Sequence, residues 1–388
     1  MSKDQPSQLG KLAPMAIGDQ KLGRHIGFFS GTVMNVGEII GSGIFSNPSY
    51  ILKNTGSGGM MLILWIVGAL TSVSGLLTFL ELGTMLPRSG GEKTYIGYIY
   101  HKPNQLLSFI FMVMVGICTR CGSLAQGSIV FGDNMVYAMY GGNERNEWAS
   151  RGFGGILPNR PSLTTNFSFN GTVQNAGSYA NAIYFNLPRC GATSIAFATV
   201  VYLLANCAYL SVLSLEMIKS SDLTVAAHLF NVAFGGTFGS HVLPVFVGLS
   251  SFGMVGVIVY SASRVILEFA REGHLPFDRY FSKVHPTLQT PVPALLLLYG
   301  LSLVFLLGPP PGTVFEFIIA FTNYGEYFFA ALCAIGIFIL RHREPDLKRP
   351  IRAPTIFVFF FIAVCIFTIV FVFLPPTHAP ASYPYYGN

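Results

Sequence analysis

Several apolar stretches of about 20 residues or more constrain the fold of this chain most strongly. A helix of that length crosses a hydrocarbon core of roughly 30 Å. Because backbone groups inside lipid must be paired within their own segment, these stretches are predicted to be helices. The apolar pattern indicates about eight spans with approximate bounds Ile26–Tyr50, Met60–Leu82, Leu106–Tyr140, Ala192–Leu215, Val242–Phe269, Val292–Leu307, Val314–Leu340 and Ile356–Leu374.

Composition supports a membrane protein. Hydrophobic residues make up 52% of the chain and charged residues only 10%, against roughly 25% charged residues in soluble domains. This balance excludes the soluble, disordered and disulfide-scaffold classes. The net charge of +6 comes from Lys and Arg in short clusters beside the apolar stretches. Such clusters set membrane orientation, so we expect a lipid bilayer and no nucleic acid as partner.

The sequence contains no motif for enzyme chemistry. It has no HExxH, no phosphate loop and no GxSxG elbow, and its eight His are dispersed. Cys118 and Cys121 form a CxxC pair, but they lie in an apolar stretch with no second pair nearby. In that setting Cys behaves as a small hydrophobic residue. We therefore expect no enzyme activity, no cofactor and no metal site.

Positive charge in the loops indicates the orientation of the chain, because cytosolic loops are enriched in Lys and Arg. Three spans bring the chain outside by Tyr140, whereas the fourth must begin inside at Arg189. One crossing is therefore missing in the polar linker 141–189, which has no apolar run long enough to span. Its sequons at Asn166 and Asn170 favour an outside location for its middle.

The first span is weakened in its middle. Gly41 and Gly43 flank Ser42, and Pro48 follows within the same stretch. Glycine is less favourable than alanine in a helix interior by about 1 kcal/mol, so a break is expected here. A broken helix presents the N-terminus of its second half, whose partial positive charge suits an anionic group. The alternative interpretation is that small residues on this stretch only allow close helix packing.

Several motifs in order along the chain resemble one transporter family. They are Gly41-Ser42-Gly43-Ile44-Phe45, Glu81-Leu82-Gly83 with Leu86-Pro87-Arg88-Ser89-Gly90-Gly91-Glu92-Lys93, Tyr202-Leu203-Leu204-Ala205-Asn206, Ser263-Arg264 with Arg271-Glu272-Gly273-His274-Leu275-Pro276, and the run from Leu340-Arg341 to Arg349-Pro350. Together they resemble the amino acid–polyamine–organocation (APC) superfamily, in particular L-type amino acid transporters and fungal methionine permeases. The resemblance covers most of the chain outside residues 141–189.

The resemblance implies an all-α polytopic membrane protein with the LeuT-type fold of twelve helices. Here the fold is expected to be incomplete, with about eight transmembrane helices, because the fourth, fifth, most of the sixth and the twelfth have no counterpart. The expected segments are a cytosolic tail 1–25, helices 1–3 in 26–140, the linker 141–189, helices resembling family helices 7–11 in 190–375, and a tail 376–388.

The resemblance also implies a substrate site on the first helix. Backbone around Ser42 and Gly43 would bind the substrate carboxylate, and carbonyls near Ile39 would accept from its α-amino group. The adjoining Gly41 and Ile44 are the remaining candidate substrate-binding residues on this helix. On the tenth family helix Tyr324 is a further candidate pocket residue, although aromatic residues at helical spacing also serve in packing.

Charged residues inside spans are costly and often functional. Glu38 and Arg120 are the deepest candidates, with Asp133, Glu316 and Glu326 behind them. Glu38 precedes the expected break by about one helical turn, so it is a candidate proton site or a partner for Arg120. A structural ion pair between the two is the alternative.

These features predict a multi-pass transporter of neutral L-amino acids, large neutral ones or methionine, located in the plasma membrane. Alternating access around a site at the membrane midplane would carry the substrate. Proton coupling and exchange both remain open, as does a single-span partner subunit. The alternative from another class is a truncated, transport-inactive isoform or gene-model fragment that persists as a membrane-bound interaction protein.

Overall fold

The computed structural model describes residues 28–86, 91–100, 102, 106–141, 147–156, 187–273, 275–285, 290–308 and 314–371. The expected N-terminal tail, both sequons and the tail 376–388 lie outside these residues, as does most of the linker.

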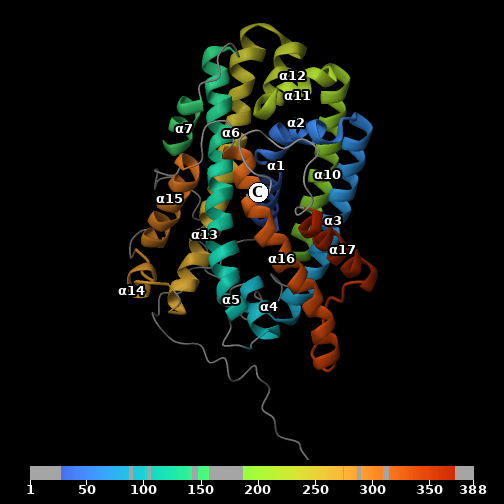
Figure 1. The fold of residues 1–388 in the computed structure, drawn as a ribbon, viewed down its shortest axis with the longest axis vertical. Coiled ribbons are helices and arrows are strands. Elements are labelled where there is room, and N and C mark those ends of the chain that lie inside the picture. The colour runs from blue at the N-terminus through green and yellow to red at the C-terminus, as the bar shows by residue number, and fades with distance from the viewer. Residues whose placement is uncertain are drawn as a thin grey trace, which may run out of the picture.

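The described residues fold into helices joined by short connections, with no strand among them (Figure 1). The helices in chain order are α1 (Phe28–Ile40), α2 (Gly43–Thr55), α3 (Gly58–Met85), α4 (Glu92–Ile99), α5 (Leu106–Phe111), η2 (Met112–Thr119), α6 (Arg120–Tyr140), α7 (Glu147–Ile156), α10 (Leu187–Val212), α11 (Leu215–Ser220), η5 (Asp222–Thr224), α12 (Val225–Phe234), η6 (Phe238–Val242), α13 (Leu243–Arg271), α14 (Asp278–Phe281), α15 (Val292–Leu307), α16 (Val314–Arg343) and α17 (Thr355–Phe371).

Within the described part of the chain, five helices are long and apolar enough to cross a membrane. They are Gly58–Met85, Leu106–Tyr140, Pro188–Val212, Phe238–Arg271 and Tyr324–Arg343. Shorter apolar helices cover two further predicted spans. The predicted first span is present as two helices of 13 residues each, α1 and α2. The chain is therefore an all-α polytopic membrane protein, as the apolar pattern predicts.

Several helix boundaries differ by a few residues from the approximate spans, and several short helices lie outside those spans. The fourth span begins at Leu187, five residues before the predicted Ala192, because Pro188 is tolerated in the first turn of a helix. The predicted linker contains a helix, α7, which is too short to span a membrane. The short apolar helix α12 was not predicted, since its 10 residues are too few to span a membrane.

The helix α6 is central to one side of the molecule, where it packs against α7, α13, α15 and α16. On the other side α1 packs between α10 and α13, while α17 packs on α3 and α16. The short helices α11 and α12 lie at the α2 end of the molecule, and α4 and α5 lie at the opposite end (Figure 1).

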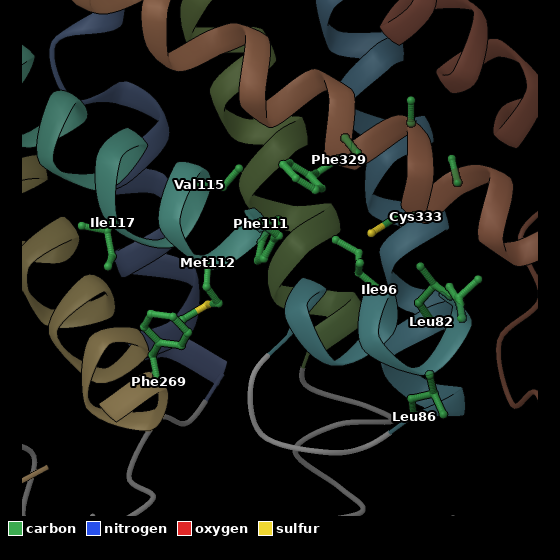
Figure 2. Packing of buried hydrophobic residues seen from close by; sticks show 14 of the residues in the cluster. Leu82, Leu86, Ile96, Phe111, Met112, Val115, Ile117, Phe269, Phe329 and Cys333 are labelled. Carbon is green, nitrogen blue, oxygen red and sulfur yellow. The ribbon is translucent and has the colours of Figure 1, made fainter. Parts of the chain in front are cut away.

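A buried apolar cluster at the α4 end joins the two sides. Phe111 and Phe329 meet edge to face with ring centroids 5.2 Å apart, and Ile96 lies beside them (Figure 2). Such aromatic pairs contribute roughly 0.5–1.5 kcal/mol beyond the burial of their area. The cluster therefore fixes α5 and α16 relative to α4.

A buried ion pair closes the same end. The Glu81 carboxylate is fully buried and accepts two hydrogen bonds from Arg341, at 2.9 and 2.5 Å. It also accepts from the Ala353 backbone N–H at 2.8 Å, and Arg341 donates to the Ala353 carbonyl. One carboxylate thus links α3, α16 and the segment before α17.

Candidate functional site

The predicted interruption is present between α1 and α2. The last α-helical backbone bond of α1 runs from the Gly41 N–H to the Gly37 carbonyl at 3.1 Å, and Gly43 then opens α2. Gly41 has φ of +30°, a region that strains residues with a side chain. A Cβ at this position would lie 2.3 Å from Sδ of Met254. Both the backbone and the close approach of α13 therefore require glycine.

The interruption leaves a backbone donor without a partner. The Ser42 N–H makes no hydrogen bond within the described residues, and the Ser42 side chain does not cap α2. Its hydroxyl points instead to Sδ of Met254 at 3.6 Å. The uncapped N-terminus of a helix favours an anion through its free N–H groups and its dipole. The turn at Ser42 can therefore hold a carboxylate.

The carbonyls around the turn are bonded by hydroxyls of other helices. Tyr202 on α10 donates to the Ile39 carbonyl at 2.7 Å, and Ser250 on α13 donates to the Gly41 carbonyl at 3.1 Å. Tyr202 is only 8% exposed, and its ring packs on Trp65 with centroids 4.5 Å apart. Both carbonyls are therefore occupied by side-chain donors of neighbouring helices.

A second tyrosine of α10 supports α2. Pro48 lies four residues after Ile44 and has no N–H to offer to the Ile44 carbonyl. Tyr209, seven residues after Tyr202, donates its hydroxyl to that carbonyl at 3.2 Å. Two tyrosines on one face of α10 thus satisfy acceptors on both sides of the interruption.

The structure brings Glu38 and Arg120 together. Oε1 of Glu38 lies 3.4 Å from Nη1 of Arg120, and their side chains are 39% and 35% exposed. Arg120 opens α6 directly after the π-helix η2, in which Thr119 bonds the Met114 carbonyl at 3.1 Å. This pair joins the helix that carries the interruption to the central helix.

The remaining predicted residues are dispersed. Tyr324 is half-buried on α16, and no hydrogen bond is recorded from it to the Ser42 turn. Asp133 is buried within α6, and Glu326 lies on α16. The side chain of Glu316 lies outside the described residues. Cys118 and Cys121 are free thiols, and no group of metal-ligating side chains occurs in the described part of the chain.

Two ionisable residues at the start of α4 are perturbed by their surroundings. Burial and, to a smaller extent, the nearby Glu326 carboxylate raise the pKa of the Glu92 carboxyl to about 7, although Arg120 opposes this rise. Burial also lowers the pKa of the neighbouring Lys93 to about 8, although it pairs with Glu272 at the end of α13. The charges near this end of the bundle are therefore sensitive to pH around neutrality.

Sequence reasoning missed three side chains at the interruption. Tyr202 belongs to one of the family motifs, but the sequence does not mark Tyr202, Tyr209 or Ser250 as partners of the broken helix. The available signal was the spacing of two tyrosines on an apolar helix, because a buried tyrosine hydroxyl needs a partner. That signal says nothing about which helix supplies the partner.

The fold and the interruption define a class: an integral multi-pass membrane protein with a discontinuous helix and, within the described residues, an unpartnered backbone N–H at the break. The model of the amino acid permease family matches residues 26–158 and 105–386. The chain therefore belongs to the amino acid permease family, within the APC superfamily.

Among similar proteins is the low-affinity methionine permease of Saccharomyces cerevisiae, 29% identical over 405 positions that cover 86% of this chain and 73% of the permease. The human cystine/glutamate transporter is 27% identical, with 93% and 82% covered, and the mouse Asc-type amino acid transporter 1 is 28% identical, with 91% and 77% covered. Since 405 positions exceed the 388 residues of this chain, the methionine permease carries residues with no counterpart here. These relatives are described as permeases and transporters, and they support amino acid transport in general.

Proposed function

We propose that the chain is a secondary active transporter of neutral L-amino acids, large neutral ones or methionine, that works by alternating access. The observation that carries the proposal is the unpartnered Ser42 N–H at the uncapped start of α2. Discontinuous helices with such ends bind the carboxylate of small substrates in secondary transporters. The bundle would rock around this site to open it to each side in turn.

Each part of a zwitterion has a place at the interruption. The carboxylate binds the backbone from Ser42 to Ile44, and the ammonium group is held by the Ile39 and Gly41 carbonyls. Tyr324 on α16 contributes to the wall that contacts the substrate side chain. The roles of Ile39, Ser42 and Gly43 are those implied by the resemblance, and Tyr324 remains a candidate pocket residue. The roles of Gly41 and Ile44 are inferred from their place beside these residues.

The charge balance of the Glu38–Arg120 pair is compatible with a neutral substrate side chain. Arg120 is paired with Glu38, so the pair brings no net charge to the region beside the interruption. The relatives support the choice of substrate only in part. One is described as a methionine permease, whereas another is a cystine/glutamate transporter. Large neutral side chains or methionine agree with the first of these and with the charge balance.

Proton symport is the coupling that the charged residues support best. Glu38 lies three residues before Gly41, in contact with Arg120, and protonation of its carboxylate would break their ion pair. Uptake that does not depend on pH would remove any coupling role of Glu38 and favour exchange. The plasma membrane is the proposed location.

Uptake of radiolabelled methionine and leucine in a transport-deficient host tests the proposal. In the variant Gly43→Trp the new side chain meets Tyr202, whose hydroxyl would lie 2.7 Å from a Cβ at this position. In the control Gly37→Trp, on α1 before the interruption, a Cβ has nothing within 4 Å. With surface amounts equalised, Gly43→Trp should abolish uptake and Gly37→Trp should preserve it. Equal uptake by both variants rejects the site.

Competition by substrate fragments tests the two halves of the site separately. Unlabelled leucine should block uptake of labelled leucine, whereas isoamylamine, which lacks the carboxylate, and isocaproate, which lacks the ammonium group, should block it poorly. Strong inhibition by either fragment would remove the role of the missing group.

A transport-inactive membrane protein is the second candidate, and it has an observation of its own. None of the side chains of α1 is buried, and the large apolar side chains of Phe29 and Val33 are exposed. The α1 side of the proposed site is thus less enclosed than a midplane site requires, although Ser42 and Ile44 are buried. Absence of uptake from the wild-type chain, when it reaches the membrane in normal amounts, would favour this candidate.

A further inference from the structure

The Ile39 carbonyl is already bonded in the protein without substrate. The Tyr202 hydroxyl donates to it at 2.7 Å across 163 residues of sequence. Inside a membrane protein an unpaired carbonyl is costly, so some donor must occupy it when no substrate is present. The tyrosine is that donor.

The Tyr202 hydroxyl lies against the interruption itself. A Cβ on Gly43 would come within 2.7 Å of its oxygen, so only a glycine leaves room for the hydroxyl beside the start of α2. Ile39 itself is 39% exposed. The aromatic ring rests on Trp65, with centroids 4.5 Å apart and planes at 53°.

We propose that Tyr202 is a latch residue: its hydroxyl substitutes for the substrate ammonium at the Ile39 carbonyl of the empty protein and leaves that carbonyl when a substrate binds. The inference rests on the proposed function, because it takes the Ile39 carbonyl as the ammonium acceptor. A contact that exists only in the empty state lowers the affinity for the ligand that breaks it. Tyr202 is therefore a positioning residue that sets affinity for the substrate ammonium.

The variant Tyr202→Phe keeps the ring on Trp65 and removes the hydroxyl. The Ile39 carbonyl then lacks its donor in the empty protein and gains one from the substrate. Equilibrium binding of labelled methionine to the purified full chain should tighten, with Kd lowered by roughly three- to tenfold, the size of one net hydrogen bond.

Thermal unfolding separates a latch from a merely structural tyrosine. Empty Tyr202→Phe should unfold at a lower temperature than empty wild type, whereas the two should unfold together at saturating methionine. The control is Tyr299→Phe, whose hydroxyl donates to the Gly155 carbonyl at 3.2 Å between α15 and α7. That bond does not involve the proposed site, so its loss should lower both unfolding temperatures equally and leave Kd unchanged.

A second measurement uses tryptophan fluorescence in a chain that retains Tyr202. It therefore does not depend on whether Tyr202→Phe folds. The chain has two tryptophans, and Trp148 is exposed on α7. In Trp148→Phe the remaining Trp65 reports on the ring of Tyr202. Saturating methionine should change its fluorescence emission, and unchanged emission with bound methionine contradicts the latch.

The outcomes distinguish the two proposals. Wild-type protein that binds no neutral amino acid overturns the proposed function and the latch with it. Binding by wild type with an equal or higher Kd in Tyr202→Phe overturns the latch alone, since the hydroxyl would then be irrelevant to the substrate or a direct part of its site.

Discussion

At the scale of single residues, the interruption depends on Gly41. Its φ of +30° and the 2.3 Å approach of Met254 leave no room for a side chain. Gly37 lies one turn earlier on the same helix, where a Cβ has nothing within 4 Å. Glycine is required by the backbone and by packing at position 41 but not at position 37, so substitutions at the two positions can be compared directly.

Alanine at these two positions should therefore act in opposite directions. Gly41→Ala should lower the free energy of unfolding by at least about 1–2 kcal/mol, the cost of left-handed backbone for a residue with a Cβ. Gly37→Ala should be neutral or raise it by up to about 1 kcal/mol, because alanine favours helix. Thermal unfolding of the purified proteins in detergent measures both. Equal stability of the two variants would show that the interruption does not depend on Gly41.

Glu92 predicts a dependence of stability on pH. Its carboxyl has a pKa of about 7 in the folded protein, above its ordinary value of 4.5, chiefly because it is buried. Between these values the folded state binds more protons than the unfolded chain, so stability falls as pH rises through this window. Glu92→Gln removes the titrating group.

We expect the unfolding temperature of Glu92→Gln to change less than that of wild type between pH 4.5 and pH 7, and to exceed it above pH 7. Glu216→Gln, at an exposed position of α11, controls for the loss of a carboxylate elsewhere. A parallel pH dependence in Glu92→Gln and wild type would contradict the prediction.

At the scale of elements, α10 supports the broken helix. Pro48 deprives the Ile44 carbonyl of its helical donor, and Tyr209 replaces that donor from α10. In Tyr209→Phe the carbonyl is buried without a partner, which should cost about 1–3 kcal/mol of stability.

Restoring an N–H to the helix tests this explanation. In a Pro48→Ala background the alanine N–H can bond the Ile44 carbonyl, so Tyr209→Phe should cost much less there than in wild type. Urea unfolding of the four proteins of this double-mutant cycle measures the coupling. The same cost of Tyr209→Phe in both backgrounds would disprove the link between Pro48 and Tyr209.

At the scale of the whole molecule, the Glu81 ion pair connects helices that are distant in sequence. Glu81 is fully buried, and it bonds both Arg341 and the Ala353 backbone. Removing one partner of a buried pair typically costs about 3–5 kcal/mol, because the other charge stays buried.

Glu81→Gln should therefore strongly lower the unfolding temperature and the amount of protein in the membrane. Glu268→Gln is the control, since Glu268 pairs with Arg271 only three residues away on α13 and is 37% exposed. Pairs of that kind contribute less than about 1 kcal/mol. Comparable effects of the two substitutions would assign the Glu81 pair a minor role.

Much of the architecture follows from local properties of the sequence. The helical stretches were predicted from apolar length alone, and the interruption from two glycines around Ser42. The misplaced start of α10 shows the limit of this reasoning, since a helix can extend through Leu187 and Pro188 into less apolar sequence. The hydrogen bond from Tyr202 to the Ile39 carbonyl cannot be predicted from local sequence properties at all.

The amino-acid sequence by itself determined that this chain spans a membrane as helices, because a helix must be about 20 apolar residues long to cross the hydrocarbon core. It also determined where the first helix breaks, because glycine destabilises a helix interior. Only the tertiary structure decided which hydroxyls donate to the Ile39 and Gly41 carbonyls, and that the Ser42 N–H has no partner among the described residues. Those hydroxyls come from α10 and α13, more than 160 residues away. Helical periodicity tells which face of a helix is apolar, but it does not tell which other helix that face meets.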